Sequence, residues 1–392
     1  MDRKKITLET PYGTKDLLPI EAIGKRNVEQ ILSNLFISWG YDEVVTPTIE
    51  YLDTLAPRIQ SNELSLFKFF SNNKTLALRN ELTTPIARLV SSRFKDTTSP
   101  LKLSYIGNVF RFEQTQMGRQ CEFHQAGVEL MGSNSASADA EIIALAIEAI
   151  LKCGIEDFQI CMGQVNFLTG ILTQFHIEHE YQKKLKDAIE CHDIVLMNSI
   201  IDSLSLTSEE KDILRELPLL NGTEEILQPL YKFSLNEQTR AALENLAEIY
   251  QLLKSYCLDQ YVRFDFSIIR DFDYYTGMVF EGYAPGLGFP LCGGGRYDHL
   301  LENFGRSRPA TGFAIGIERI LLTLERQGTR KLHHTKKIYV SYTSGKVQKA
   351  IQMAKNLRQN GKIADLGLEA QSFEEAEAFR QKHGYDALEY IT

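Results

Sequence analysis

The chain has 392 residues, of which 43% are hydrophobic and 24% are charged, and its formal net charge is −8. These values are typical of a globular protein large enough for two domains, and the negative charge weighs against phosphate-backbone binding as its main task. The sequence contains no apolar run of membrane-spanning length, and no apolar segment follows its basic N-terminal residues, so we predict neither a membrane span nor a signal peptide.

Up to residue 165, the spacing of apolar residues and the turn and cap residues predict alternating helices and strands. The expected elements are a helix over 22–39, a strand over 41–48, paired strands over 66–70 and 75–78, a helix over 81–94, strands over 101–111 and 127–132, a helix from the cap Ser137 to Cys153, and a strand over 155–162. A polar loop over 113–122 separates the two longer strands.

After residue 165 the pattern changes to helix. The interval 166–257 contains few glycines and is expected to be a helical insertion. Strands return over 261–267, 278–283 and 289–293, and a strand-like start at Gly312 runs into a helix that reaches Leu324. The combination predicts an α+β fold, in which helices flank and interrupt an antiparallel sheet.

We expect the core to occupy residues 1–325 and a polar linker to occupy residues 326–336. Residues 337–392 have the pattern of a small β-α-β-α-β domain. Within it, Ser372 and Glu375 have the spacing of a capping box at the start of the second helix.

Two arginines are candidates for binding an anionic group. Arg111 lies between phenylalanines on a predicted strand, and Arg319 closes the run G-F-A-I-G-I-E-R. A guanidinium can hold a phosphate or a carboxylate through paired donors. By itself, Arg111 is better explained by an ordinary surface ion pair, and an ion pair is also the simpler explanation of Arg319.

Four further residues have side chains that suit a small polar ligand. Gln125 and Glu129 would share one face of a strand, with Gly127 leaving room between them. Glu81 and Thr83 stand where a strand gives way to a helix, and local evidence alone favours helix capping for them.

A polar and aromatic run precedes the strand at 278–283. It contains Arg270, Tyr274 and Tyr275, and Tyr297 follows a triple-glycine run nearby. A tyrosine offers a flat apolar wall and one hydroxyl, which suits a ring such as imidazole. The alternatives are hairpin-turn chemistry around Gly277 and a simple glycine bend at 293–295.

The sequence gives no support for a metal or a cofactor. Its six cysteines form no C-x-x-C pair, which favours a reducing cytoplasm. His176-x-x-His179 and His333-His334 lack a third ligand at a supporting spacing. The triple-glycine run is not followed by the G-K-[ST] of a P-loop.

Six ordered motifs resemble the catalytic core of class II histidine–tRNA ligases. They are G-T-K-D-L-L-P at 13–19, L-R-N-E-L-T at 78–83, F-R-F-E at 110–113 with F-H-Q-A-G-V-E at 123–129, R-D-F-D-Y-Y-T-G at 270–277, G-G-G-R-Y-D at 293–298 and G-F-A-I-G-I-E-R at 312–319. The resemblance covers about residues 7–325. It implies a class II synthetase-like fold with a six-stranded antiparallel sheet, forming a homodimer through the region 40–48.

The chain departs from the ligase pattern at Gln114 and Cys121, where the ligases typically carry arginines. The C-terminal anticodon-binding domain is also cut short. Losing two guanidinium groups removes charge-assisted contacts near the triphosphate and the acceptor end. This combination resembles the regulatory-subunit family of ATP phosphoribosyltransferase, a set of ligase paralogues that make no aminoacyl-tRNA.

The resemblance implies a non-catalytic protein that binds neither tRNA nor a membrane. It implies a hetero-oligomer with the short-form catalytic transferase, in which this chain senses histidine as the feedback inhibitor of the first step of histidine biosynthesis. Its effector site would comprise the residues that match the ligase pocket. Glu81, Thr83 and Gln125 would hold the ammonium group, Glu129, Tyr274, Tyr275 and Tyr297 the imidazole, and Arg270 the carboxylate, while Arg111 and Arg319 would be remnants of a nucleotide site.

Two other functions remain open at this point. A working histidine–tRNA ligase with a shortened tail would show histidine-dependent ATP–pyrophosphate exchange. A stand-alone amino-acid or nucleotide sensor would bind its ligand without associating with a transferase.

Overall fold

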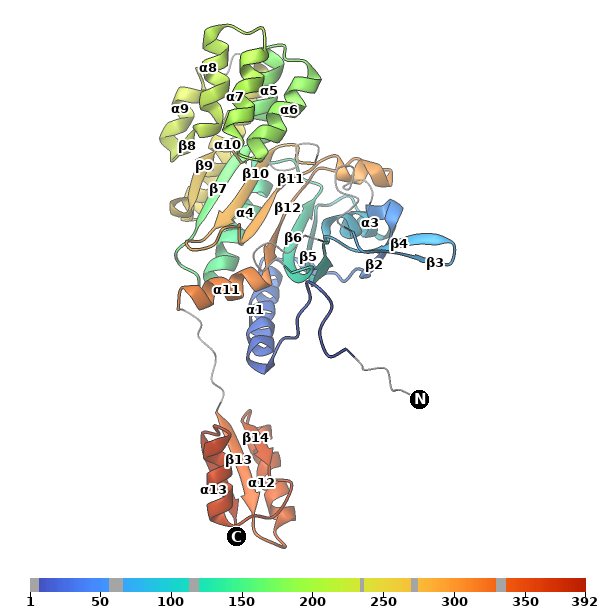
Figure 1. The fold of residues 1–392 in the computed structure, drawn as a ribbon, viewed down its shortest axis with the longest axis vertical. Coiled ribbons are helices and arrows are strands. Elements are labelled where there is room, and N and C mark those ends of the chain that lie inside the picture. The colour runs from blue at the N-terminus through green and yellow to red at the C-terminus, as the bar shows by residue number, and fades with distance from the viewer. Residues whose placement is uncertain (1–6, 56–65, 113–119, 233–235, 269–273, 329–335) are drawn as a thin grey trace. The chain divides into compact units, whose positions relative to one another are not determined.

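The structure is a computed structural model that describes residues 7–55, 66–112, 120–232, 236–268, 274–328 and 336–392. The chain divides into two compact units, Met1–Arg330 and Lys331–Thr392 (Figure 1). By residue number, all the candidate site residues belong to the first unit. Most of the predicted linker at 326–336 falls on residues outside the described ranges.

A nine-stranded sheet forms the centre of the first unit. In spatial order its strands are β1 (Asp42–Glu43), β5 (Leu101–Phe110), β6 (Glu122–Met131), β12 (Ala310–Gly316), β11 (Cys292–Arg296), β10 (Met278–Tyr283), β7 (Gln159–Gln164), β9 (Val262–Asp265) and β8 (Asn221–Gly222). The six strands from β5 to β7 are antiparallel to one another. By contrast, β1 and β9 each add to the sheet in parallel. The predicted α+β fold around a six-stranded antiparallel sheet is therefore confirmed, with three further strands at its edges.

One face of this sheet is covered by apolar helices. These are α1 (Pro19–Ser38), α4 (Ala136–Lys152) and α11 (Ile317–Arg326). Ile143 and Ile147 of α4 are completely buried and share one hydrophobic core with Phe280 and Phe313 of the sheet. Alternation along each strand then directs the intervening residues to the opposite face.

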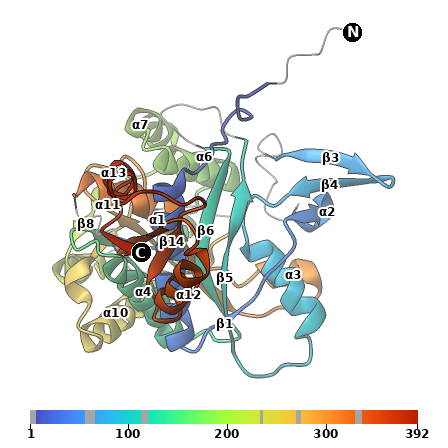
Figure 2. The ribbon, with the colours of Figure 1, turned by 90° about the horizontal axis from the view of Figure 1, so that it is seen from below.

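A second, three-stranded sheet stands beside the first. It consists of β2 (Ile49–Tyr51), β4 (Lys74–Leu78) and β3 (Lys68–Ser71). Helix α2 (Leu52–Leu55) packs against β2 and β4, and helix α3 (Thr83–Arg93) packs against α2. The predicted hairpin is confirmed. Its turn residues Asn72 and Asn73 have φ of 51° and 58°, as a two-residue type I′ turn requires. The hairpin projects beyond the edge of the main sheet (Figures 1 and 2).

The predicted helical insertion is confirmed between β7 and β9. Its helices are α5 (Val165–Gln174), α6 (His179–Glu190), α7 (Ile194–Ser203), α8 (Ser208–Glu216), α9 (Leu227–Leu230) and α10 (Glu237–Ser255), with 3-10 turns at Leu217–Leu219, Glu224–Ile226 and Asp259–Tyr261. The two-residue strand β8 interrupts it, because the chain returns there to pair with β9. Another 3-10 turn, Leu300–Phe304, follows β11.

The second unit contains β13 (Lys337–Tyr342), α12 (Val347–Gln359), β14 (Ile363–Leu366), α13 (Phe373–Lys382) and β15 (Ala387–Ile391). Its strands form a parallel sheet in the order β14-β13-β15. The predicted capping box is confirmed: the Ser372 amide donates to the Glu375 carboxylate at 2.8 Å, and the Glu375 amide donates to the Ser372 hydroxyl at 3.2 Å.

Several predicted boundaries are wrong. Helix α4 is capped by Ser135 and not by Ser137, because the Ser135 hydroxyl accepts from the Ala138 amide at 3.3 Å. Strand β6 begins at Glu122, five residues before the predicted start, because its first half pairs with the end of β5. The glycine run at 293–295 is part of strand β11 and not a bend, and only Asp42–Glu43 of the predicted strand 41–48 is a strand.

Among the described residues, no helix combines the length and the apolar character that crossing a bilayer demands.

The sheet admits no side chain at Gly127. A methyl group there would overlap the Phe313 carbonyl oxygen and the Tyr105 ring. We expect Gly127→Ala to lower the free energy of unfolding by about 2 kcal/mol in urea denaturation, since backbone must shift to make room. Gly288→Ala is the matched control, because a methyl group there would meet no atom within 4 Å. Equal stability of the two variants would contradict this account of the packing.

Candidate functional site

The face of the main sheet opposite the helices has a floor of glycines. Cross-strand pairing and alternation place Gly107, Gly127, Gly293, Gly295, Gly312 and Gly316 on it, and we call it the glycine face. At five of them the absence of a side chain makes room for another side chain of the fold, namely Arg79 at Gly107, Tyr105 at Gly127, Tyr275 at Gly295, Glu129 at Gly312 and Arg319 at Gly316. The predicted site residues Gln125 and Glu129 project from this face, on either side of Gly127.

The Glu129 carboxylate is a buried charged group on the glycine face. Glu129 is only 1% exposed and lies directly against Gly312. Its partner is the hydroxyl of Tyr297, which donates to the carboxylate. Burial and the nearby Glu129 charge raise the pKa of Tyr297 well above its ordinary value, so the phenol keeps its proton. A buried acceptor is thereby held in a fixed orientation.

Three tyrosines form a wall beside Glu129. The ring of Tyr274 stacks on that of Tyr297 at a centroid distance of 5.1 Å and an angle of 13°. Tyr275 meets Tyr274 edge-on, at 4.8 Å and 77°. This wall and the Glu129 oxygen together offer a flat surface and a hydrogen-bond acceptor, the two features that a neutral or protonated imidazole needs.

The start of helix α3 adds a second buried carboxylate. Glu81 is 5% exposed and accepts from the amides of Thr83 at 2.6 Å and Thr84 at 2.9 Å. It therefore caps the helix, as the local pattern indicates. The next residue, Leu82, packs in the same apolar cluster as Tyr105 and Tyr297, which brings this helix start to the tyrosine wall.

One of the two candidate anion-binding arginines, Arg319, lies near Gln125. The aliphatic part of Arg319 covers Gly316, which is the cross-strand partner of Gln125. The Arg319 guanidinium lies 5.1 Å above the Phe289 ring and donates to the Pro290 carbonyl at 2.5 Å.

Arg111 follows strand β5. Its Nε donates to the Asn80 carbonyl at 2.9 Å, and its guanidinium lies 5.4 Å from the centroid of Phe123. Both arginines thus contact a backbone carbonyl and an aromatic ring of the fold.

Other residues singled out in the sequence have a different status. Cys121 is buried, its amide donates to the Gly13 carbonyl at 2.7 Å, and its thiol lies against Gly13. Arg270 and Gln114 lie outside the described residues. Within the described part of the chain, no three His, Cys, Asp or Glu side chains are arranged to hold a metal ion.

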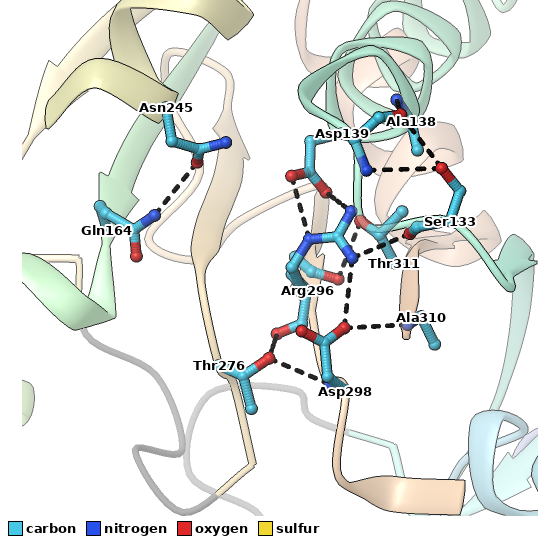
Figure 3. Close-up of polar contacts among 12 residues, drawn as sticks. Ser133, Ala138, Asp139, Gln164, Asn245, Thr276, Arg296, Asp298, Ala310 and Thr311 are labelled. Carbon is cyan, nitrogen blue, oxygen red and sulfur yellow. Dashed lines mark hydrogen bonds and ion pairs between the residues drawn. The ribbon is translucent and has the colours of Figure 1, made fainter. Parts of the chain in front are cut away.

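Sequence reasoning missed a buried ion pair behind the tyrosine wall. Arg296, on the helix side of β11, donates to both oxygens of Asp139 in α4, at 3.1 and 2.8 Å (Figure 3). The same guanidinium donates to the Ser133 carbonyl at 3.0 Å and to Asp298 at 3.2 Å. The signal was present: Asp139 shares a helix face with Ile142 and Ile143, and an acid on a buried face requires a partner.

The attraction between the opposite charges of Arg296 and Asp139 opposes the cost of burying them. Burial alone would lower the pKa of Arg296, but Asp139 and Asp298 hold it above its ordinary value. Burial also raises the pKa of the Asp139 carboxyl, and the attraction of Arg296 opposes that rise. The two-pronged geometry, in which both Asp139 oxygens accept, is that of an ionised pair.

The pair also fixes the segment that carries the tyrosines. The Thr276 amide donates to the Arg296 carbonyl at 2.8 Å, and the Asp298 amide donates to the Thr276 hydroxyl at 3.0 Å (Figure 3). Asp298 also accepts from the Ala310 amide of β12 at 3.0 Å. Tyr275 and Tyr297 are the neighbours of these anchored residues, so their positions follow from the network.

A further polar contact joins the sheet to the helical insertion. The Gln164 side chain, at the end of β7, donates to the Asn245 side chain of α10 at 3.1 Å (Figure 3).

A family model described as histidyl-tRNA synthetase matches residues 13–320. The chain therefore belongs to the histidyl-tRNA synthetase family. Two curated relatives are similar to it in sequence over most of its length. A protein of Moorella thermoacetica is 40% identical over 388 residues, which is 98% of each chain. One of Desulforamulus reducens is 41% identical over 350 residues, which is 89% of this chain and 87% of that one. Both are named ATP phosphoribosyltransferase regulatory subunit. Within the wider family, the chain belongs to these regulatory subunits.

Solved structures agree with this placement. A Bacillus halodurans protein described as ATP phosphoribosyltransferase regulatory subunit/histidyl-tRNA synthetase superposes with a TM-score of 0.89 at 33% identity, covering 99% of this chain and 100% of that one. Histidyl-tRNA synthetase from Nostoc sp. PCC 7120 superposes with a TM-score of 0.85 at 22% identity, covering 97% and 90%. The second comparison shows the shared fold alone.

We expect Asp139→Asn to lower the free energy of unfolding by about 3 kcal/mol, because it leaves the buried Arg296 charge without its main counterion. Urea denaturation measures this loss. Glu180→Gln is the control, since it removes one carboxylate of an exposed ion pair with Lys184, and such pairs contribute little. Wild-type stability of the Asp139 variant would show that the pair does not hold the fold.

Proposed function

We propose that this chain is the regulatory subunit of an ATP phosphoribosyltransferase and has no catalytic activity of its own. The observation that supports it most directly is the Glu129–Tyr297 pair beside the tyrosine wall. Such a site can recognise a ring with N–H donors without any reacting group nearby. The names of the closely similar relatives supply the transferase as the partner.

The effector we propose for this site is histidine. The imidazole would lie against Tyr274 and Tyr275 and donate to Glu129, and the ammonium group would meet Glu81, with Thr83 and Gln125 adding polar contacts. Arg270 would pair with the carboxylate. Two buried carboxylates at one site favour a ligand that carries positive charge and several donors, because such a ligand compensates them.

Two features favour binding over catalysis. Gln114 and Cys121 replace arginines of the ligase pattern, and the Cys121 thiol is buried against Gly13. Arg111 and Arg319, which match arginines of the ligase pattern, favour the ligase alternative instead. From the first two features we propose that ATP is not activated at this site and that no tRNA is charged, so the alternative of a working ligase becomes an outcome of the test.

We further propose an assembly in which a homodimer of this chain binds the short-form catalytic subunits. Exposed apolar side chains on the segment around β1 and β2 support a protein–protein contact there, since Val45 is 82% exposed and Ile49 is 48% exposed. Feedback inhibition would follow if histidine binds an inactive assembly more tightly than an active one.

The test is to purify the chain together with its cognate short-form transferase and to assay condensation of ATP with phosphoribosyl pyrophosphate. We expect the two chains to co-purify, activity to require this chain, and histidine to reduce that activity. Full activity of the transferase alone, or failure of the chains to associate, would contradict the proposal.

We expect Glu81→Gln to weaken histidine binding by at least tenfold in calorimetry, because the neutral amide loses its attraction for the ammonium group. Glutamine retains one side-chain oxygen to accept from the Thr83 or Thr84 amide, so the helix cap is partly preserved. Glu210→Gln, at the cap of α8, is the matched control, because the Glu210 carboxylate accepts from the Thr207 amide at 2.8 Å. Unchanged affinity in the Glu81 variant would rule out this role.

A further inference from the structure

A second buried arginine, Arg79, lies between the proposed histidine site and the segment that joins β1 to β2. It is 5% exposed, and its guanidinium lies against Gly107 on the glycine face. Its Nη1 donates to the Thr46 carbonyl at 2.7 Å and to the Pro47 carbonyl at 3.3 Å. Its backbone amide donates to the Thr48 carbonyl at 3.0 Å. One residue thus contacts three successive carbonyls.

The other side of the Arg79 guanidinium holds strand β5. Its Nε donates to the Asn108 carbonyl at 2.8 Å, and its Nη2 donates to the Asn108 side-chain oxygen at 3.2 Å. The Asn108 amide group in turn donates to Glu122 at the start of β6, at 3.1 Å. The Arg79 carbonyl accepts from the Phe110 amide at 2.9 Å.

The hydrogen-bond partners of the Arg79 guanidinium are neutral oxygens. Burial lowers the pKa of Arg79, and the more distant charge of Glu50 opposes this effect. A buried cation that is held by carbonyl dipoles depends on their geometry. A planar fork of donors suits this task, whereas a lysine ammonium could reach only part of the set.

Arg79 is separated from Glu81 by one residue, and the carbonyl of that residue, Asn80, accepts from Arg111. The turn that places the Glu81 carboxylate therefore begins at the residue that binds Thr46 and Pro47. In the same segment, Val45 and Ile49 present exposed apolar side chains. The contacts form one continuous path from the carboxylate to this exposed segment.

We propose that Arg79 is a positioning residue that couples occupancy of the Glu81 site to the conformation of residues 44–51. A ligand that draws on Glu81 shifts the 79–83 turn, and Arg79 transmits that shift to the carbonyls of Thr46 to Thr48. By linkage, a partner that binds the exposed segment alters ligand affinity through the same residue. This inference rests on the proposed histidine site.

The experiment compares wild type, Arg79→Lys and Arg308→Lys by histidine calorimetry and by hydrogen–deuterium exchange with and without histidine. In wild type, we expect saturating histidine to slow exchange in peptides covering both 79–85 and 44–51. In Arg79→Lys, we expect histidine to bind about tenfold more weakly, and its effect at saturation to persist in 79–85 but vanish in 44–51. A purely structural role would not remove the response of one peptide alone.

Arg308→Lys is the matched control, because Arg308 also donates to backbone carbonyls, those of Thr97 and Ser99, and we expect it to behave as wild type. Histidine protection of 44–51 in Arg79→Lys equal to wild type would overturn the inference, as would a wild-type segment that does not respond. If wild type binds no histidine, the proposed site fails instead. The inference then survives only if Arg79→Lys speeds exchange in both peptides without ligand, and a change in only one of them would overturn it.

Discussion

The buried ion pair between Arg296 and Asp139 is the interaction on which the site depends most. It joins strand β11 to helix α4. The Arg296 carbonyl accepts from the Thr276 amide, and the Thr276 hydroxyl accepts from the Asp298 amide. Burying two charges is favourable only when their remaining donors and acceptors are also satisfied, and here a backbone carbonyl and a second carboxylate complete the set. Because Tyr275 and Tyr297 adjoin these residues, the pair behind the sheet determines the shape of the wall in front of it.

The two faces of the main sheet differ: one packs against helices and stabilises the fold, and the other carries the candidate site. Its helix side is a continuous apolar core, whereas on its other side the glycines leave room for polar and aromatic side chains, among them Glu129, Tyr275 and Arg79. A scaffold of this kind supports a ligase or a sensor equally well, since the fold does not specify the reaction. At the edge of the site, Arg111 and Arg319 contact the fold itself and Cys121 is buried against Gly13. The proposed function requires that this site still bind its ligand and no longer activate a nucleotide.

Local patterns predicted much of the fold. The hairpin at Asn72–Asn73 and the capping box at Ser372 were predictable because their chemistry is contained within four residues. The cap of α4 was misplaced by two residues because serines stand at 133, 135 and 137, and only the three-dimensional turn selects one. The Arg296–Asp139 pair spans 157 residues of sequence, and Arg79 reaches Thr46 across 33. No local pattern contains such contacts. The ordered motifs therefore singled out the three tyrosines of the wall, but they did not reveal the Arg296–Asp139 pair or the Arg79 contacts.

The central claim is that this site binds histidine without activating it. The most direct measurement combines histidine calorimetry with histidine-dependent ATP–pyrophosphate exchange on the same purified protein. The account predicts saturable histidine binding with one site per chain and no exchange above the protein-free rate. Exchange that rises with histidine and turns over repeatedly would contradict the claim, because it would show that the nucleotide chemistry of the ligase persists.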